Sequence, residues 1–429
     1  MKKINMKGMR KLSITATAMV AAAVMALAGC GSSGTADSAA SGSSGSAKSD
    51  TFMAAGLFPL TGSMAYLGPA NIATMKLAQK DINAAGGVLG KDIEITSADT
   101  SDADHADQNT SSAQSVLAKN PSVVVGPPSS SVVKNTYKQV TSAKVPMISS
   151  GATSTAFSGL SDYFFRTIPP DTVQGAVLGQ IIAQDGVKNL AIAVFNDEYG
   201  TSLRDVVVKT VEDAGVNVVY GEKDTFDPTE TNFSSMVTAI KATNPDATLV
   251  IAFDQTKPLL KALASAGVNT KKLYFVDGNT SDYSSELDAG LLKGSKGTIP
   301  GVNPSDDFVK RLESTGVDLK NTTTYGAETY DGIILAALAA QKGGSADGKT
   351  IQANMAAVSG STKGEKCDSY KACVALLKDG KEIQYQGQTS IGAFNDAHDP
   401  SSASIGVYKY DADNKPVFDH SQEGSVPKA

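Results

Sequence analysis

The stretch Ser122-Val123-Val124-Val125-Gly126-Pro127-Pro128-Ser129-Ser130-Ser131 shows how this chain folds. Its apolar run, Ser122 to Gly126, is short and ends in turn-forming residues, which is typical of a buried strand. Residues 132–140 then follow a helical pattern, and serine is favoured at helix N-termini. The stretch therefore predicts a strand that turns directly into a helix, which is the repeating unit of an α/β fold.

Similar apolar runs recur and alternate with helical patterns. They occur at 145–148, 189–195, 217–220, 247–253 and 272–276. Ile72, Met75, Ala78 and Ile82 fall on one helical face, and the glycines at 86–87 end that helix. Strands that alternate with helices predict parallel sheets. About 380 residues of this pattern exceed one comfortable core, so we expect two α/β lobes with a ligand cleft beyond the carboxyl ends of the strands.

The composition excludes several kinds of function. With 38 Lys+Arg, 44 Asp+Glu and a formal net charge of -6, the chain lacks the basic character of a nucleic-acid-binding protein. Three histidines and three scattered cysteines do not predict a metal centre. The common hydrolase, metalloprotease, phosphate-loop and dinucleotide motifs are absent, so we expect no enzyme activity, no catalytic residue and no cofactor. Asp99–Asp107 could bind a cation, but it lacks the glycine and the terminal Glu of an EF-hand loop and is expected to be an acidic, solvated loop.

Residues 1–29 have the features of a secretory signal. Basic residues precede an apolar stretch from Ala16 to Ala28, which is shorter than the ~20 residues of a membrane-spanning helix. Leu27-Ala28-Gly29-Cys30 resembles the lipobox of bacterial lipoproteins, which implies cleavage before Cys30 and a lipid on its thiol. The alternative is an ordinary signal peptide with an incidental cysteine. Residues 30–50 are rich in Gly and Ser, and they predict a flexible tether with a reach of roughly 25 Å.

The two remaining cysteines, Cys367 and Cys373, lie close together in the sequence. In an exported protein such a pair is expected to form a disulfide. The alternatives are two free thiols or a redox-active pair, although the spacing is not C-x-x-C.

Several segments together resemble one protein family. They are Phe58 to Gly62, Tyr66 to Gly68, Lys80 to Gly87, Val125 to Ser131, Ile148 to Ser154, Phe164 to Thr167, Asn196 to Gly200 and Tyr325 to Asp331. In their order and spacing they are similar to the type I periplasmic-binding-protein family, and within it to the leucine/isoleucine/valine-binding group that serves ABC importers. The resemblance covers nearly all of residues 51–410.

The resemblance implies two Rossmann-like lobes that close on a ligand by hinge motion. Three crossovers would join the lobes near Thr167, Thr298 and Asp396. Lobe 1 would then consist of residues 51–167 and 299–396, and lobe 2 of residues 168–298 and 397–429.

The resemblance also implies a seat for a ligand carboxylate. In the family, a serine at a helix start and an Ala-Thr pair in the next strand–loop hold this group. Here these match Ser130, with Ser129 one step away, and Gly151-Ala152-Thr153. A helix start offers free backbone N–H groups and a positive dipole end, and backbone oxygens near Ala152 could accept from an ammonium. The alternative is that Ser130 only caps its helix and that Thr153 only starts another.

The remaining site residues would hold the ammonium and the side chain of the ligand. Asp277 matches the position where the family places a carboxylate, often Glu, although the alignment there needs a gap. Tyr199 matches a tyrosine that lines the second lobe. Tyr66 lies one position from a family aromatic, where Leu67 stands, and Phe253 occupies a position where tyrosine is often found. The alternatives are a turn aspartate and aromatic residues that only pack in the core.

From these observations we expect a monomeric, exported solute-binding lipoprotein, anchored by lipid to the outer face of the cell membrane. It would capture a small polar metabolite, first of all a branched-chain or other aliphatic amino acid, and hand it to the permease subunits of an ABC transporter. The alternative is a ligand-sensing receptor-like protein for amides or small organic acids. A sensor of this fold usually continues into a membrane span or a signalling domain, and a surface adhesin would show repeats; the sequence shows neither.

Overall fold

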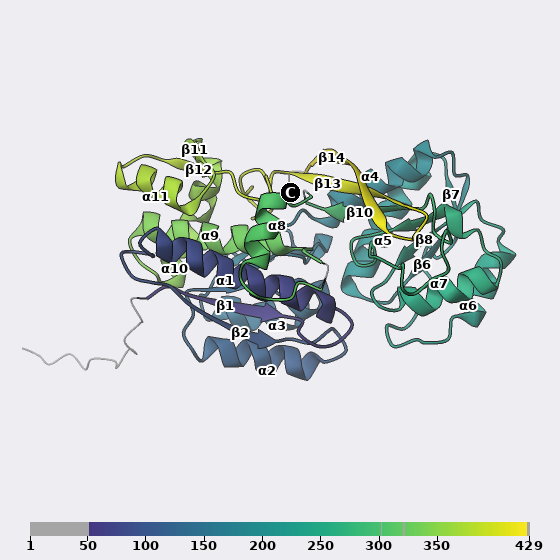
Figure 1. Ribbon diagram of the computed structural model, residues 1–429, viewed down its shortest axis with the longest axis horizontal. Coiled ribbons are helices and arrows are strands. Elements are labelled where there is room, and N and C mark those ends of the chain that lie inside the picture. The colour runs from purple at the N-terminus through teal and green to yellow at the C-terminus, as the bar shows by residue number, and fades with distance from the viewer. Residues whose placement is uncertain (1–50, 302, 321, 427–429) are drawn as a thin grey trace, which may run out of the picture. The chain divides into compact units, whose positions relative to one another are not determined.

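The computed structural model describes residues 51–301, 303–320 and 322–426. The signal, the tether and Cys30 therefore lie outside the described residues. Within one compact unit, Ala47–Ala429, the described chain forms two main β-sheets that are covered by helices (Figure 1). We call the part around the five-stranded sheet lobe 1 and the part around the seven-stranded sheet lobe 2.

The sheet of lobe 1 is entirely parallel and has the order β2-β1-β3-β4-β5. Its strands are β1 (Met53–Phe58), β2 (Glu94–Asp99), β3 (Val123–Val125), β4 (Met147–Ser149) and β5 (Phe164–Arg166). Neighbouring residues alternate between two apolar clusters. Val123 and Val125 pack on one face and Val124 on the other, because successive side chains of a strand point to opposite faces.

The helices of lobe 1 cover both faces of this sheet. They are α1 (Gly68–Ala84), α2 (Ala106–Leu117), α3 (Ser130–Ser142), α8 (Asp306–Glu313), α9 (Gly326–Gly343), α10 (Gly348–Ala356) and α11 (Tyr370–Lys378), with the short helices η1 (Ala65–Leu67), η2 (Thr155–Phe157) and η4 (Ala357–Ser361). Residues of α1 and α9 share one apolar cluster, and residues of α2 and α3 share the other (Figure 1). Gly86 has a φ of 98°, which confirms that a left-handed glycine follows the end of α1.

The sheet of lobe 2 has the order β14-β13-β10-β9-β8-β6-β7. Its strands are β6 (Asn189–Val194), β7 (Asn217–Tyr220), β8 (Ala247–Ile251), β9 (Leu273–Phe275), β10 (Lys296–Pro300), β13 (Ser402–Tyr410) and β14 (Pro416–Ser425). Its helices are α4 (Asp171–Gln184), α5 (Glu198–Asp213), α6 (Ser234–Ala242), α7 (Thr256–Ser265) and η3 (Thr270–Lys272). The β10–β13 and β13–β14 pairs are antiparallel, and the other pairs are parallel.

The chain crosses between the two sheets three times. It passes from β5 to α4 through residues 167–170, leaves β10 after Pro300, and returns shortly before β13. Because β10 extends to Pro300, residues 299–300 pair within the seven-stranded sheet. His398, by contrast, stacks on Phe165 of lobe 1 with ring centroids 4.2 Å apart. The division of the chain at residues 298 and 396 stays a prediction.

A small two-stranded sheet is attached to lobe 1. It pairs β11 (Glu365–Cys367) with β12 (Ile383–Tyr385) and lies beside α11. The structure contains a disulfide between Cys367 and Cys373, with an S–S distance of 2.09 Å. No helix among the described residues is long and apolar enough to cross a membrane.

Candidate functional site

The start of α3 is one edge of the candidate site. Ser129 is the N-cap residue, and its Oγ accepts a hydrogen bond of 3.3 Å from the backbone N–H of Val132. Ser130 is the first helical residue, and both serines are buried. The strand can turn this sharply because Gly126 adopts a φ of 87° and lies so close to Leu57 that a Cβ would meet its carbonyl oxygen at 2.3 Å. Because the hydroxyl oxygen of Ser129 accepts from the N–H of Val132, Ser129 rather than Ser130 caps the helix.

The loop after β4 lies directly beside this helix start. The hydroxyl group of Ser149 donates a hydrogen bond of 2.7 Å to the carbonyl oxygen of Pro127. The backbone N–H of Ser154 donates one of 3.3 Å to Oγ of Ser130. The structure thus brings the Ser129–Ser130 and Gly151–Thr153 segments together. Thr153 is fully buried, and its Oγ1 has no hydrogen-bond partner.

A fully buried arginine, Arg166, holds this loop in place. Its Nη1 donates hydrogen bonds to the carbonyl oxygens of Ala152, at 3.3 Å, and Ser154, at 2.8 Å. Its Nη2 donates to Oγ of Ser158, and its Nε pairs with Asp399. The carbonyl of Ala152, which the sequence suggested for a ligand ammonium, therefore already accepts a hydrogen bond from the protein.

Asp277 lies in the loop after β9 and connects the two lobes. Its Oδ1 accepts hydrogen bonds from the hydroxyl group of Tyr199, at 2.6 Å, and from Nε2 of Gln174, at 2.9 Å. Its Oδ2 accepts one from the hydroxyl group of Tyr325, the residue before α9 in lobe 1. Asp277 is 5% exposed, and no Lys, Arg or His of the described chain forms an ion pair with it.

The electrostatics of this cluster follow from burial. Burial raises the pKa of Asp277, and the hydrogen bonds from Tyr199, Tyr325 and Gln174 oppose this shift. Burial, together with the nearby charge of Asp277, raises the pKa of both tyrosines well above the usual value. Both phenol groups therefore remain protonated at neutral pH and donate hydrogen bonds to Asp277.

Aromatic side chains form a wall beside Asp277. The rings of Tyr199 and Phe253 are stacked with centroids 5.7 Å apart and planes at 7°. Tyr66 is half-buried, and its hydroxyl group reaches across to the carbonyl oxygen of Gly278 at 3.4 Å. Leu67 is fully buried in the same apolar cluster as Tyr199 and Phe253. The structure thus brings the three aromatic residues singled out in the sequence to one region, where all three also take part in packing.

The start of α5 makes further contacts with lobe 1. Oγ of Ser131 donates a hydrogen bond of 2.6 Å to Asp197. Glu198 accepts hydrogen bonds from Lys134, at 2.7 Å, and from Ser154, at 3.0 Å. These contacts join lobe 2 to the same two segments of lobe 1 that carry Ser130 and Thr153.

Sequence reasoning missed four residues of this region, Tyr325, Arg166, Gln174 and Asp171. Tyr325 adopts a left-handed φ of 60°, and nothing in its local sequence signals that conformation. Arg166 belongs to a segment of the family resemblance, but its ion-pair partner, Asp399, is 233 residues away in sequence. Asp171 reads as an ordinary acidic residue in the first turn of a helix.

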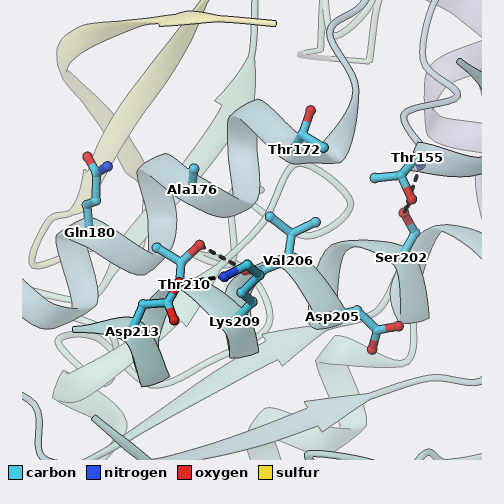
Figure 2. Close-up of a pocket in the computed structure, with 10 residues that line it drawn as sticks. All are labelled: Thr155, Thr172, Ala176, Gln180, Ser202, Asp205, Val206, Lys209, Thr210 and Asp213. Carbon is cyan, nitrogen blue, oxygen red and sulfur yellow. Dashed lines mark hydrogen bonds and ion pairs between the residues drawn. The ribbon is translucent and has the colours of Figure 1, made fainter. Parts of the chain in front are cut away.

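Two other regions could be considered as alternative sites, and their contacts argue against both. A surface groove of about 560 Å³ lies between α4 and α5 and contains none of the predicted site residues (Figure 2). The acidic loop near Asp99 uses its carboxylates within the protein: Asp99 accepts from Leu60 and Thr61, and Asp102 accepts from Ser63. No group of His, Cys, Asp and Glu that could hold a metal ion occurs in the part of the chain that the structure describes.

Comparison with known proteins identifies the class. The model of the periplasmic binding protein family matches residues 53–366, so the chain belongs to that family. Its members are solute-binding proteins and not enzymes, and the chain is a substrate-binding protein of the kind used by ABC transporters, which acts outside the cytoplasm.

Curated relatives cover most of the chain. The Leu/Ile/Val-binding protein BraC3 of Rhizobium johnstonii is 26% identical over 82% of this chain and 90% of its own length. The leucine-, isoleucine-, valine-, threonine- and alanine-binding protein of Pseudomonas aeruginosa is 28% identical over 71% of this chain and 81% of its own length.

Solved structures share the fold at lower identity. The branched-chain amino acid transporter substrate-binding protein LivJ of Streptococcus pneumoniae, in complex with isoleucine, has a TM-score of 0.69 at 20% identity over 87% of this chain and 99% of that one. A solute-binding protein of R. palustris in complex with 4-hydroxybenzoate has a TM-score of 0.72 at 19% identity over 88% and 98%. These structures confirm the type I periplasmic-binding-protein fold with its two lobes.

Proposed function

We propose that this protein captures an aliphatic amino acid between its lobes and delivers it to the permease subunits of an ABC transporter. The observation that carries this proposal is Asp277, a buried carboxylate at the lobe junction that contacts only neutral donors. A buried charge without a charged partner is costly, so a cationic group on the ligand would stabilise it. The names of the curated relatives, which include leucine, isoleucine and valine binding, support the same choice.

The carboxylate of the ligand would lie at the start of α3. There, Ser130 and Thr153 are in adjacent segments, and a helix start offers backbone N–H groups and a positive dipole to a carboxylate. The stacked rings of Tyr199 and Phe253 provide an apolar wall for a side chain. An acid for the ammonium, hydrogen-bond donors for the carboxylate and an apolar wall beside the acid for the side chain match a zwitterion with an aliphatic side chain.

The protein is further proposed to be monomeric and held at the outer face of the cell membrane by a lipid on Cys30. A second candidate ligand is an aromatic or other small organic acid. The same aromatic wall favours it, and the R. palustris neighbour is described in complex with 4-hydroxybenzoate. The receptor-like alternative, in which the protein senses such acids or amides without transport, would use the same candidate site.

A titration-calorimetry screen tests the proposal. The panel consists of leucine, isoleucine, valine, alanine, their amides, benzoate and 4-hydroxybenzoate. A thermal-shift screen runs in parallel, because a ligand at 100 times its Kd stabilises a protein by about 2.7 kcal/mol. Binding of one or more amino acids with little response to the acids supports the proposal. Binding of the acids alone would contradict it.

A further inference from the structure

One buried side chain, Gln174 of α4, connects the acid of the candidate site to a strand that leads into a crossover. Its Nε2 lies 2.9 Å from Oδ1 of Asp277, 3.2 Å from the carbonyl oxygen of Thr298 and 3.1 Å from Oγ1 of Thr298. All three residues are buried. Thr298 belongs to β10, which ends at Pro300, where the chain enters the second crossover. Gln174 therefore joins Asp277 to the strand that precedes this crossover.

The orientation of the Gln174 amide follows from its neighbours. A carboxylate and a backbone carbonyl only accept hydrogen bonds, so the NH2 end of the amide faces Asp277 and Thr298. Its two N–H groups are enough for one bond to each residue. Oε1 is left without a donor among the described residues. Because a buried acceptor without a donor is unfavourable, packing alone does not explain a glutamine at this position.

The hydrogen bonds of Asp277 divide between its two oxygens. Oδ1 accepts from Gln174 of α4 and from Tyr199 of α5, which both belong to lobe 2. Oδ2 accepts from Tyr325 of lobe 1. Two donors on two different helices fix the rotation of a carboxyl group, whereas a single donor leaves it free to pivot. With Oδ1 held in this way, Oδ2 is the oxygen that faces lobe 1.

We propose that Gln174 is a positioning residue of the ligand site: it holds Asp277 against β10 so that Oδ2 faces the other lobe. This inference rests on the proposed function, in which the charge of Asp277 stabilises the ammonium group of the ligand. Without the amide of Gln174, Tyr199 is the remaining donor to Oδ1. Asp277 then turns more freely, and its attraction for the ammonium group weakens because the charge is no longer held in place.

Titratable side chains from four elements act on Asp277 electrostatically. They are Tyr66 of η1, Asp171 of α4, Tyr199 of α5 and Tyr325 before α9. Burial raises the pKa of the three tyrosines, so they stay neutral at neutral pH. Burial also raises the pKa of Asp171 to about 7, while the hydroxyl groups of Ser202 and Thr153 oppose this shift. The two carboxyl groups therefore have to be followed separately in any titration.

The charge of Asp277 depends on its contact with Gln174. Burial raises the pKa of Asp277, and the hydrogen bond from Gln174 is one of those that lower it. Loss of this bond should raise the pKa of Asp277 further, so that more of it is protonated at a given pH. Because an ammonium group favours the charged form, ligand affinity falls as the pH drops through this pKa. In a Gln174 variant that fall should begin at a higher pH.

The first test uses the protein without ligand. Carbon-13 NMR of labelled aspartate carboxyl groups, with Asp277→Asn to assign the signal, follows the titration of Asp277 directly. Gln174→Met keeps the length of the side chain but cannot donate, and Gln174→Asn keeps the amide but is too short to reach both partners. Gln180→Met is the matched control, because Gln180 is exposed on the same helix and contacts Gln422. We expect both Gln174 variants to raise the pKa of Asp277 and the control to leave it unchanged.

The second test is calorimetry with two matched ligands. Leucine carries an ammonium group, and 4-methylpentanoate has the same carbon skeleton without it. We expect Gln174→Met to weaken leucine binding about tenfold at neutral pH, to move the fall in leucine affinity to higher pH and to spare 4-methylpentanoate. A merely structural role of Gln174 would weaken the binding of both ligands equally.

The outcomes distinguish this inference from the proposed function. If the unmodified protein does not bind leucine or another aliphatic amino acid, the proposed ligand is wrong, and the NMR titration alone decides whether Gln174 positions Asp277. An unchanged pKa of Asp277 in the Gln174 variants overturns the inference even where leucine binds. Unchanged leucine affinity, or equal loss of both ligands, overturns it as well. If Gln174→Met does not fold, Gln174→Asn takes its place in both measurements.

Discussion

Nζ of Lys134 in lobe 1 lies 2.7 Å from Oε2 of Glu198 in lobe 2, while the other oxygen of Glu198 accepts a hydrogen bond from Ser154. Lys134 is on α3 and Ser154 follows the candidate ligand loop, so one glutamate contacts both segments of the carboxylate seat. Among the described residues, the side chain of Glu198 forms its hydrogen bonds with Lys134 and Ser154 and with none of the proposed ligand-binding residues. Its position suits a residue that stabilises the closed lobes and thereby slows ligand release.

Removing this contact is expected to speed up ligand dissociation. The ion pair is partly exposed, so Lys134→Ala should cost about 1 kcal/mol or less, and Glu198→Ala somewhat more because it also removes the bond to Ser154. Stopped-flow measurements should show a several-fold higher dissociation rate for Glu198→Ala. High salt should reduce the difference between Lys134→Ala and the unmodified protein. Equal dissociation rates in all three proteins would show that the contact plays no part in closure.

The carboxylate seat gives the second prediction. The double variant Ser130→Ala/Thr153→Ala should lose ligand binding with little change in fold, because hydrogen bonds to charged groups contribute about 1.5–3 kcal/mol each. Ser129→Ala is the matched control: it removes the helix cap, so it should lower the free energy of unfolding by about 1 kcal/mol while binding persists. Calorimetry and thermal unfolding measure the two effects. Unchanged affinity in the double variant would reject the site.

The buried Glu328 leads us to expect that the free energy of unfolding depends on pH. It is buried near the second crossover, where Gly301 would place a Cβ only 2.3 Å from its Oε1. Burial raises the pKa of Glu328 from its ordinary value of 4.5 to about 8. The folded state keeps the proton of Glu328 up to a higher pH than the unfolded state does. The contribution of Glu328 to the free energy of unfolding is therefore greatest below pH 4.5 and falls as the pH rises to 8.

The variant Glu328→Gln tests this effect. It should unfold at a higher temperature than the unmodified protein at pH 8, with a gain on the order of a few kcal/mol, and the gain should shrink towards pH 5. Scanning calorimetry across this pH range provides the measurement. A constant difference between the two proteins at every pH would contradict the titration of Glu328.

The lipid anchor can be tested through Cys30. The variant Cys30→Ser should lack the modified thiol, so the protein should no longer be recovered with membranes after fractionation. Metabolic labelling with a fatty acid should mark only the protein that retains Cys30. Labelling of both proteins, or an identical distribution between fractions, would refute the lipoprotein assignment.

Much of the fold could be predicted from local patterns. The apolar run expected to be a strand at 122–126 contains β3 (Val123–Val125), and the serines after it begin α3, because a buried strand and a helix start have local sequence signatures. The site was harder to predict, because its contacts join residues far apart in the chain. Tyr325 reaches Asp277 from another lobe and has a left-handed backbone.

The buried guanidinium of Arg166 has a consequence for how the protein recognises ligands. By fixing the carbonyls of Ala152 and Ser154 and pairing with Asp399, it orders the loop when the chain folds. The conformational entropy of that loop is then lost during folding and not during capture, which leaves more of the interaction energy for affinity. Such preorganisation acts on every ligand alike, so discrimination between ligands falls to the side chains around it.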